Sequence, residues 1–225
     1  MKIISVLFFI SVFSLTVFAQ AVPGKTEITG DEMEVLKTGE VIISKGNSKA
    51  VNGRNTIKAD KMTYVKKDNT VSAEGNVRLS SKTDDDEPLE ARGRYAKYDT
   101  GTERGKLWGN NTKIEYYMKS SSSPLVLKAQ EVYVDRHLET LSAYTDVEVV
   151  TSSGTIFSDN AVFDKNDESI VMKKDKKRPV ADVDYDGRKG VYEADAMTFY
   201  NAEKNKKIIM SGDVKGTVEM EDKIQ

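Results

Sequence analysis

The chain has 225 residues and a formal net charge of −2 at pH 7, from 34 basic and 36 acidic side chains. This balance argues against a nucleic-acid-binding protein, for which a basic stripe would be expected. The sequence contains no cysteine, which excludes disulfides, zinc–thiolate sites and thiol nucleophiles.

Residues 1–19 have the pattern of a secretory signal peptide. Lys2 is followed by an apolar run from Ile3 to Phe18, and Ala19 provides a small residue at the cleavage position. The run is shorter than the roughly 20 residues that span a bilayer. We therefore predict that the chain is exported, with cleavage after Ala19 or Ala21 and one domain over residues 20–225. An uncleaved membrane anchor is the alternative.

A short phrase recurs six times along the rest of the chain. In each copy, side chains of different character alternate at the start. Most copies then contain a carboxylate or amide residue, and they end on an apolar or aromatic residue. The copies begin 29 to 36 residues apart, at Ile28, Ile57, Ala91, Leu127, Ile156 and Tyr192. Periods of this size indicate an array of supersecondary units, none of which can bury its own apolar face.

Several copies are followed by a Gly-polar or Thr-Asp pair, as in AEGNVRL from Ala73 and MSGDVKG from Met210. We interpret these pairs as turns that lead into new strands. Further hairpin turns are predicted at Asn52-Gly53, Asp68-Asn69, Asp99 to Gly101, Asn166-Asp167 and Asp186-Gly187. Protruding loops, each at a hairpin tip, are predicted at Asp84 to Pro88, Ser120 to Pro124 and Lys173 to Pro179.

Alternation of apolar and polar side chains continues from Thr26 to Met220, which predicts an all-β domain with an apolar inside and a charged outside. An apolar trough of this kind could hold an acyl chain. The residues expected to share the interior, and so the candidate lipid-binding groove, are Met33, Ile57, Met62, Tyr64, Val77, Leu79, Ile114, Val132, Val134, Val147, Phe163, Met197 and Phe199.

No catalytic motif stands out, so the protein is not expected to be an enzyme and no cofactor is expected. The single histidine, His137, is interpreted as an exposed residue at a strand end or turn. The acidic run from Asp84 to Glu87 is interpreted as a solvated loop tip.

One stretch matches a calcium-binding loop, with Asp182, Asp184, Asp186 and Gly187 followed by Glu193 at loop position twelve. Its flanks, however, have the alternation of strands and not the pattern of helices. Three outward aspartates on one strand explain the same residues, so a calcium site is only a weak candidate.

The phrase I-x-A-D-x-M-x-Y followed by V-x-A-x-G-N-V, clearest from Ile57 to Leu79, resembles the OstA-like family of lipopolysaccharide-transport proteins. The third copy departs from the motif, with Arg94 in place of the carboxylate. The resemblance implies one elongated, twisted antiparallel β-jellyroll, here of about six hairpin units and open at both ends. It also implies a periplasmic protein that binds the acyl chains of lipid A.

As further implications of the resemblance, copies would join end to end by edge-strand pairing. They would bridge an inner-membrane LptC-like protein and an outer-membrane LptD-like translocon during outer-membrane assembly. Two alternatives remain open from the sequence. One is a membrane-anchored, LptC-like component of the same pathway, and the other is a structural β-solenoid surface protein.

Overall fold

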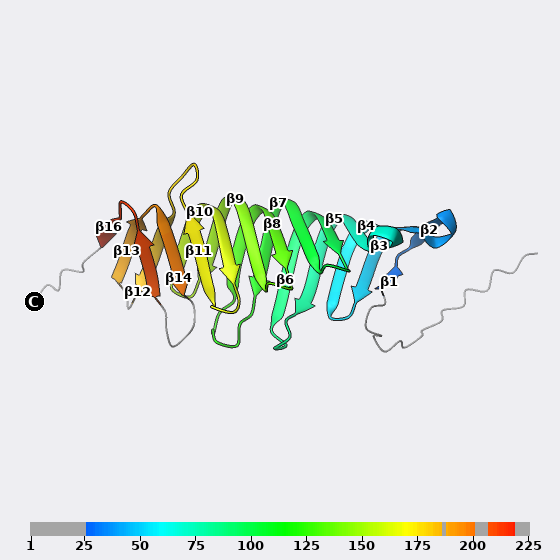
Figure 1. Ribbon diagram of the computed structural model, residues 1–225, viewed down its shortest axis with the longest axis horizontal. Helices are drawn as coiled ribbons and strands as arrows, with labels where there is room; N and C mark the ends of the chain where they lie inside the picture. The colour runs from blue at the N-terminus through cyan, green and yellow to red at the C-terminus, as the bar shows by residue number, and fades with distance from the viewer. Residues whose placement is uncertain (1–25, 186–187, 201–206, 219–225) are drawn as a thin grey trace, which may run out of the picture.

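The computed structural model describes residues 26–185, 188–200 and 207–218, and these form one antiparallel sheet of 16 strands. The sheet is rolled into a long body with β1 and β2 at one end and β16 at the other (Figure 1). No α-helix occurs in this part of the chain, which has only the short 3-10 turns η1 (Lys37–Gly39) and η2 (Lys66–Asp68). The expected signal peptide lies outside the described residues.

Eight long central strands follow one another as antiparallel hairpins, so each strand pairs with the next in the sequence. They are β3 (Val41–Asn52), β4 (Asn55–Val65), β5 (Thr70–Lys82), β6 (Pro88–Asp99), β7 (Arg104–Tyr116), β8 (Leu125–Asp135), β9 (Thr140–Thr151) and β10 (Gly154–Asp164). A β-solenoid winds its chain in coils of one direction. The alternating direction seen here contradicts the solenoid alternative.

Shorter strands complete the two ends of the sheet. The first are β1 (Thr26–Thr29) and β2 (Glu32–Leu36), and the last are β11 (Ser169–Lys173), β12 (Val180–Tyr185), β13 (Arg188–Glu193), β14 (Ala196–Tyr200), β15 (Lys207–Ser211) and β16 (Lys215–Val218). Two short strands together take the place of one long strand, one in each half of the sheet. For example, β11 and β12 both pair with β10, one with each half of it.

Each long strand bends near its middle, where its register with a neighbour shifts. The Gly-polar pairs lie at these bends. Gly75 and Asn76, for example, both have positive φ within the continuous strand β5. The prediction that such pairs are turns into new strands was wrong at Gly75-Asn76, Gly109-Asn110 and Thr145-Asp146, which lie within β5, β7 and β9; at Gly212-Asp213, β15 ends and β16 begins, as predicted. Two consecutive left-handed residues form a β-bulge that bends the strand, and the hydrogen-bond ladder resumes after it.

The fourth residue of the repeated phrase lies at the facing bend of the neighbouring strand. The Asp60 carboxylate accepts a hydrogen bond from Asn76 Nδ2 at 2.9 Å, and Asp31 accepts one from Asn47 at the same distance. A Cβ on Gly75 would lie 2.3 Å from Asp60 Oδ2, so glycine is required both for its positive φ and for space. The repeat therefore encodes a column of bends.

These bends divide the sheet into two walls that face each other across the interior. One wall contains β2, β11, β14 and β15 with one half of each long strand, and the other contains β1, β12, β13 and β16 with the other half. The hairpin tips of the two walls lie opposite the column of bends. We call the line where these tips meet the seam.

Most of the predicted turns and loops are confirmed. Strands end and restart at Asn52-Gly53, Asp68-Asn69, Asp99 to Gly101 and Asn166-Asp167, and loops follow β5 and β7. The predicted turn at Asp186-Gly187 lies outside the described residues. The loop at Lys173 to Pro179 is not a hairpin tip, because it joins β11 to β12, which pair with the same strand. This loop occupies the position that a bend occupies in each long strand. Asp159, at the facing bend of β10, accepts hydrogen bonds from the backbone N–H groups of Lys176 and Lys177.

Candidate functional site: the apolar interior of the roll

Inward-facing side chains form rows that run across the paired strands from one end of the roll to the other. One row runs Val35, Ile42, Tyr64, Val71, Tyr98, Gly105, Val134, Leu141, Phe163, Ile170, Phe199 and Ile208. A row on the facing wall runs Ile28, Ala50, Ile57, Leu79, Ala91, Ile114, Leu127, Val149, Ile156, Ala181, Tyr192 and Gly216. The two rows give the interior an apolar lining along its whole described length.

Twelve of the thirteen residues expected in the interior lie there. Those that are buried are Ile57, Met62, Val77, Ile114, Val132, Val147, Phe163, Met197 and Phe199, and those that pack partly buried against them are Tyr64, Leu79 and Val134. The thirteenth, Met33, is 49% exposed. It lies opposite buried Ser44 on the terminal pair β2–β3, so it faces inward at an open end where no further strand of the described residues covers it.

Sequence reasoning missed several interior residues, among them Leu107, Tyr116, Leu127, Ile156, Ile170 and Met172. The same alternation could have identified most of them, since Leu127 and Ile156 begin copies of the phrase. Glu87 is different, because it was assigned to a solvated acidic run and is in fact buried. Its carboxyl group accepts hydrogen bonds from the Tyr116 hydroxyl and, at 2.8 Å, from the Lys119 backbone N–H. Nothing in the local sequence indicated this.

The interior is narrow between the walls. A cavity of about 90 Å³ lies in the first half of the roll, with Ile57, Leu79, Leu107 and Ile114 among its lining residues. Further along, the ring of Tyr116 on one wall packs edge-on against Phe163 on the other, with centroids 5.5 Å apart. The lining is therefore continuous, but side chains fill much of the space.

A larger pocket of about 420 Å³ opens at the seam. We call it the seam pocket. Its floor is apolar, with Leu89, Tyr116, Val134, Leu141 and Phe163, while charged side chains form its rim. It therefore leads from a polar surface to the apolar interior.

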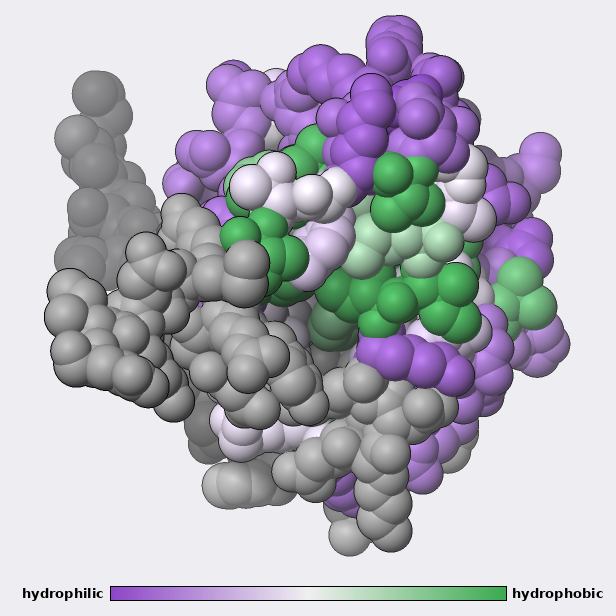
Figure 2. Space-filling view, turned by 90° about the vertical axis from the view of Figure 1, so that its left-hand side faces the viewer, coloured by the Kyte–Doolittle hydropathy of each residue, from purple (hydrophilic) through white to green (hydrophobic). Residues whose placement is uncertain are grey.

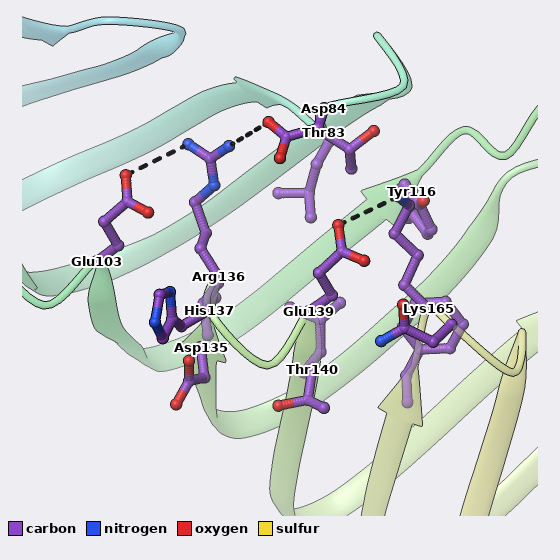
Figure 3. Close-up of a pocket in the computed structure, with 15 residues that line it drawn as sticks. Thr83, Asp84, Glu103, Tyr116, Asp135, Arg136, His137, Glu139, Thr140 and Lys165 are labelled. Carbon is purple, nitrogen blue, oxygen red and sulfur yellow. Dashed lines mark hydrogen bonds and ion pairs between the residues drawn. The ribbon is translucent and has the colours of Figure 1, made fainter. Parts of the chain in front are cut away.

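The charged rim of the seam pocket is linked by ion pairs both within one wall and across the seam, as Arg136 shows with Glu103 and Asp84 (Figure 3). Arg136 lies between Asp84, at 3.6 Å, and Glu103, at 3.9 Å. Lys165 lies 2.6 Å from Asp85 and 3.2 Å from Glu139. The hydrogen bond between Lys165 and Asp85 raises the pKa of the lysine and lowers that of the aspartate, so both groups stay charged near neutral pH.

The other candidate residues do not form a reactive site. His137 is exposed in the turn between β8 and β9, as predicted. Asp182 and Asp184 lie on β12 and Glu193 on β13, where it pairs opposite Val180, so these three extend along a hairpin and do not surround one point. Asp186 lies outside the described residues. In the part of the chain that is described, no group of three or more potential ligands could hold a metal ion.

Apolar side chains gather at the centre of the C-terminal end of the roll, with hydrophilic residues above them and to their right (Figure 2). Exposed apolar residues also mark the other end, at Met33, Val35 and Leu36. Among the described residues, no helix is long and apolar enough to cross a membrane.

Comparison with known proteins now identifies this architecture. A family model described as "LptA/(LptD N-terminal domain) LPS transport protein" matches residues 27–140, half of the chain. The chain belongs to this family. The resemblance inferred from the repeated phrase is confirmed, and the family's role is lipopolysaccharide transport and not catalysis.

A solved structure supports the fold. The chain is similar to LptH from Pseudomonas aeruginosa, the LptA-homologous periplasmic component of the lipopolysaccharide transport device, with a TM-score of 0.50. The two share 14% identity, and the match covers 57% of this chain and 95% of LptH. No curated protein matches the chain. The predicted all-β jellyroll, open at both ends, is thereby confirmed.

Proposed function

We propose that this protein carries lipopolysaccharide across the periplasm by shielding the acyl chains of lipid A between its two walls. The observation that carries the proposal is the inward apolar lining, which runs unbroken from the β1–β2 end to the β15–β16 end. A structural core would not need to reach both open ends, whereas a conduit would.

Burial of acyl chains supplies enough energy for binding. Each buried methylene contributes up to about 0.8 kcal/mol, and this contribution does not depend on a fixed geometry. A chain can therefore move along the lining without losing much affinity. A cavity of about 150 Å³ accepts a molecule as small as benzene. The internal cavity of about 90 Å³ is smaller still, so loading requires the walls to separate.

Methionine side chains support such an adjustment. Met62, Met172 and Met197 are fully buried in the interior. Their unbranched, flexible side chains adapt to irregular apolar ligands.

End-to-end assembly is the second part of the proposal, and the free edges support it. Among the described strands, β1 and β2 pair only with β3 at one end, and at the other end β15 pairs only with β14 and β16 only with β13. If β2 of one copy is placed beside β15 of another, and β1 beside β16, the strands are antiparallel and both walls continue. Unpaired strand edges favour this kind of addition.

The charges of the two edges also complement each other. Glu32 and Glu34 alternate with the inward-facing Met33 and Val35 on β2, and Lys207 occupies the outward face of β15. A chain of copies in the periplasm, following removal of residues 1–19, would link an LptC-like inner-membrane protein to an LptD-like translocon. Sequencing the mature N-terminus distinguishes this soluble carrier, which would start at Gln20 or Val22, from an anchored LptC-like protein.

Site-specific photo-crosslinking tests the lipid site. A photoreactive residue at buried Met62 or Phe163 is expected to trap lipopolysaccharide in cells. A photoreactive residue in place of Lys61, which is adjacent to Met62 but exposed, is the matched control and should trap no lipopolysaccharide. Equal trapping at Lys61 and Met62 would show that the contacts are not made inside the roll.

A further inference from the structure

Two loops reach across the seam from one wall to the hairpin tips of the other. The loop at residues 83–87, between β5 and β6, places Asp84 and Asp85 against Arg136 and Lys165. The loop between β7 and β8 places Ser120 Oγ 2.7 Å from Glu168, in the turn after β10. These contacts bridge the seam over the middle of the roll, directly above the seam pocket.

The loop at 83–87 is anchored in its own wall at both ends, and only its exposed acidic side chains reach the opposite wall. At its first residue, Arg54 Nη1 donates a hydrogen bond to the Thr83 carbonyl at 2.8 Å. Its last residue, Glu87, is buried and hydrogen-bonded to Tyr116 and to the backbone of Lys119. By contrast, the side chains of Asp84 and Asp85 are 85% and 65% exposed. Their partners Arg136 and Lys165 are only 23% and 14% exposed, but an ion pair with an acidic group in contact with water contributes only modest net stability. The loop can therefore swing away from the opposite wall without disturbing its anchor.

An amphiphile in the roll must cross this place. Its acyl chains lie between the walls while its hydrophilic head stays in water, so the junction between head and chains lies in the seam. Transfer along the roll moves that junction along the seam, and the loop at 83–87 stands in its path. The seam pocket beneath the loop has the polar rim and apolar floor that such a junction requires.

We propose that the seam pocket is a side entrance for acyl chains and that the loop at 83–87 is its latch, closed by the Asp84–Arg136 and Asp85–Lys165 ion pairs. The proposal rests on the lipid carriage proposed above. A phosphate site on Arg136 and Lys165 is disfavoured, because Glu103 and Glu139 remain beside these cations when the loop moves away.

A reversible crosslink tests the latch. The chain has no cysteine, so Asp85→Cys with Lys165→Cys provides one reactive pair, which a bifunctional methanethiosulfonate joins and a reductant releases. Uptake of cis-parinaric acid, which fluoresces in apolar surroundings, is followed by stopped flow. Joining the pair is expected to slow uptake by at least about tenfold, and reduction should restore it.

The matched control joins Lys128→Cys to Glu148→Cys, at an ion pair of 2.8 Å between neighbouring strands of the same wall. This crosslink does not cross the seam and should leave uptake unchanged. Equal uptake with the latch joined or released would overturn the side entrance, although the lipid site would stand. No fluorescence with any form of the protein would overturn lipid carriage itself and the entrance with it.

A second variant opens the latch. Asp84→Asn combined with Asp85→Asn removes both ion pairs that cross the seam, together with the Asp84–Arg54 pair on the loop's own wall, and should speed uptake by about threefold to tenfold. Glu148→Gln, which removes an ion pair within one wall, should not change the rate. An unchanged or slower rate in the double variant would contradict the latch.

Discussion

Replacing Tyr116 with phenylalanine removes one hydroxyl group from the point where the latch loop is anchored. The ring of Tyr116 is buried and packs against Phe163, and its hydroxyl donates a hydrogen bond to the buried carboxyl group of Glu87. Phenylalanine retains the ring contact. The substitution therefore isolates the hydrogen bond.

The cost follows from the surroundings of Glu87. A hydrogen bond to a charged group contributes about 1.5 to 3 kcal/mol, and a buried acceptor that loses its donor cannot turn to water instead. Glu87 keeps the Lys119 backbone N–H as a second donor. We therefore expect Tyr116→Phe to lower the free energy of unfolding by about 2 kcal/mol.

Urea unfolding followed by circular dichroism measures this change. Tyr117→Phe is the matched control, because Tyr117 is the next residue but is exposed, and it should change stability by less than about 0.5 kcal/mol. Equal effects of the two substitutions would refute the assignment of a buried hydrogen bond at Glu87.

The Tyr116 hydroxyl group should also make the stability of the folded protein depend on pH. Burial and then the hydrogen bond to Glu87 raise the pKa of Tyr116 above its ordinary value. The unfolded chain therefore loses this proton at lower pH than the folded protein, and stability falls as pH rises above about 10. Tyr116→Phe should reduce that fall, and an identical alkaline profile for both proteins would contradict the explanation.

Two further predictions concern the bends and the ends of the roll. Gly75→Ala, which forces a Cβ against the Asp60 carboxylate at a positive φ, should cost about 2 kcal/mol or more in urea unfolding. Gly53→Ala has a similar φ but open space and should cost about 1 kcal/mol, so equal costs would contradict the role of the bend. Glu34→Lys should weaken self-association by about fivefold in sedimentation equilibrium, and Lys207→Glu in the same chain should restore it, whereas independent effects would contradict the pairing of β2 with β15.

The sequence allowed the fold class and most of the interior to be predicted, because both depend on alternation. In a strand, alternate residues share a face whatever strand lies beside them, so Met62, Val132 and Phe199 could be assigned from their neighbours in the sequence. The expected roles of these residues in lipid binding stay predictions.

The bends could not be distinguished from turns by local reasoning. A hairpin turn and a bend both place consecutive residues such as Gly75 and Asn76 at positive φ. The two differ in whether the hydrogen-bond ladder between β5 and β4 resumes after these residues. This depends on a strand elsewhere in the sequence and is therefore a non-local property. The buried position of Glu87 was missed for a related reason, since its partner Tyr116 is 29 residues away.

The exposure of Met33 also depends on a non-local feature. Its position in the alternating pattern is that of an interior residue, but in the described part of the chain no strand lies beyond β2 at that end of the sheet. Sequence patterns predict which face a side chain occupies, and only the three-dimensional arrangement shows whether that face is covered.

Lipid analysis of the purified protein tests the central claim most directly. The full chain would be expressed in its native cells, isolated from the periplasm without detergent, and extracted for mass spectrometry. We predict that species containing lipid A co-purify with the protein. Their amount should fall when Met62 or Phe163 is replaced by aspartate and should stay unchanged when Lys61 is replaced by aspartate. A protein that is folded, free of lipid and unable to take up lipopolysaccharide in vitro would contradict it.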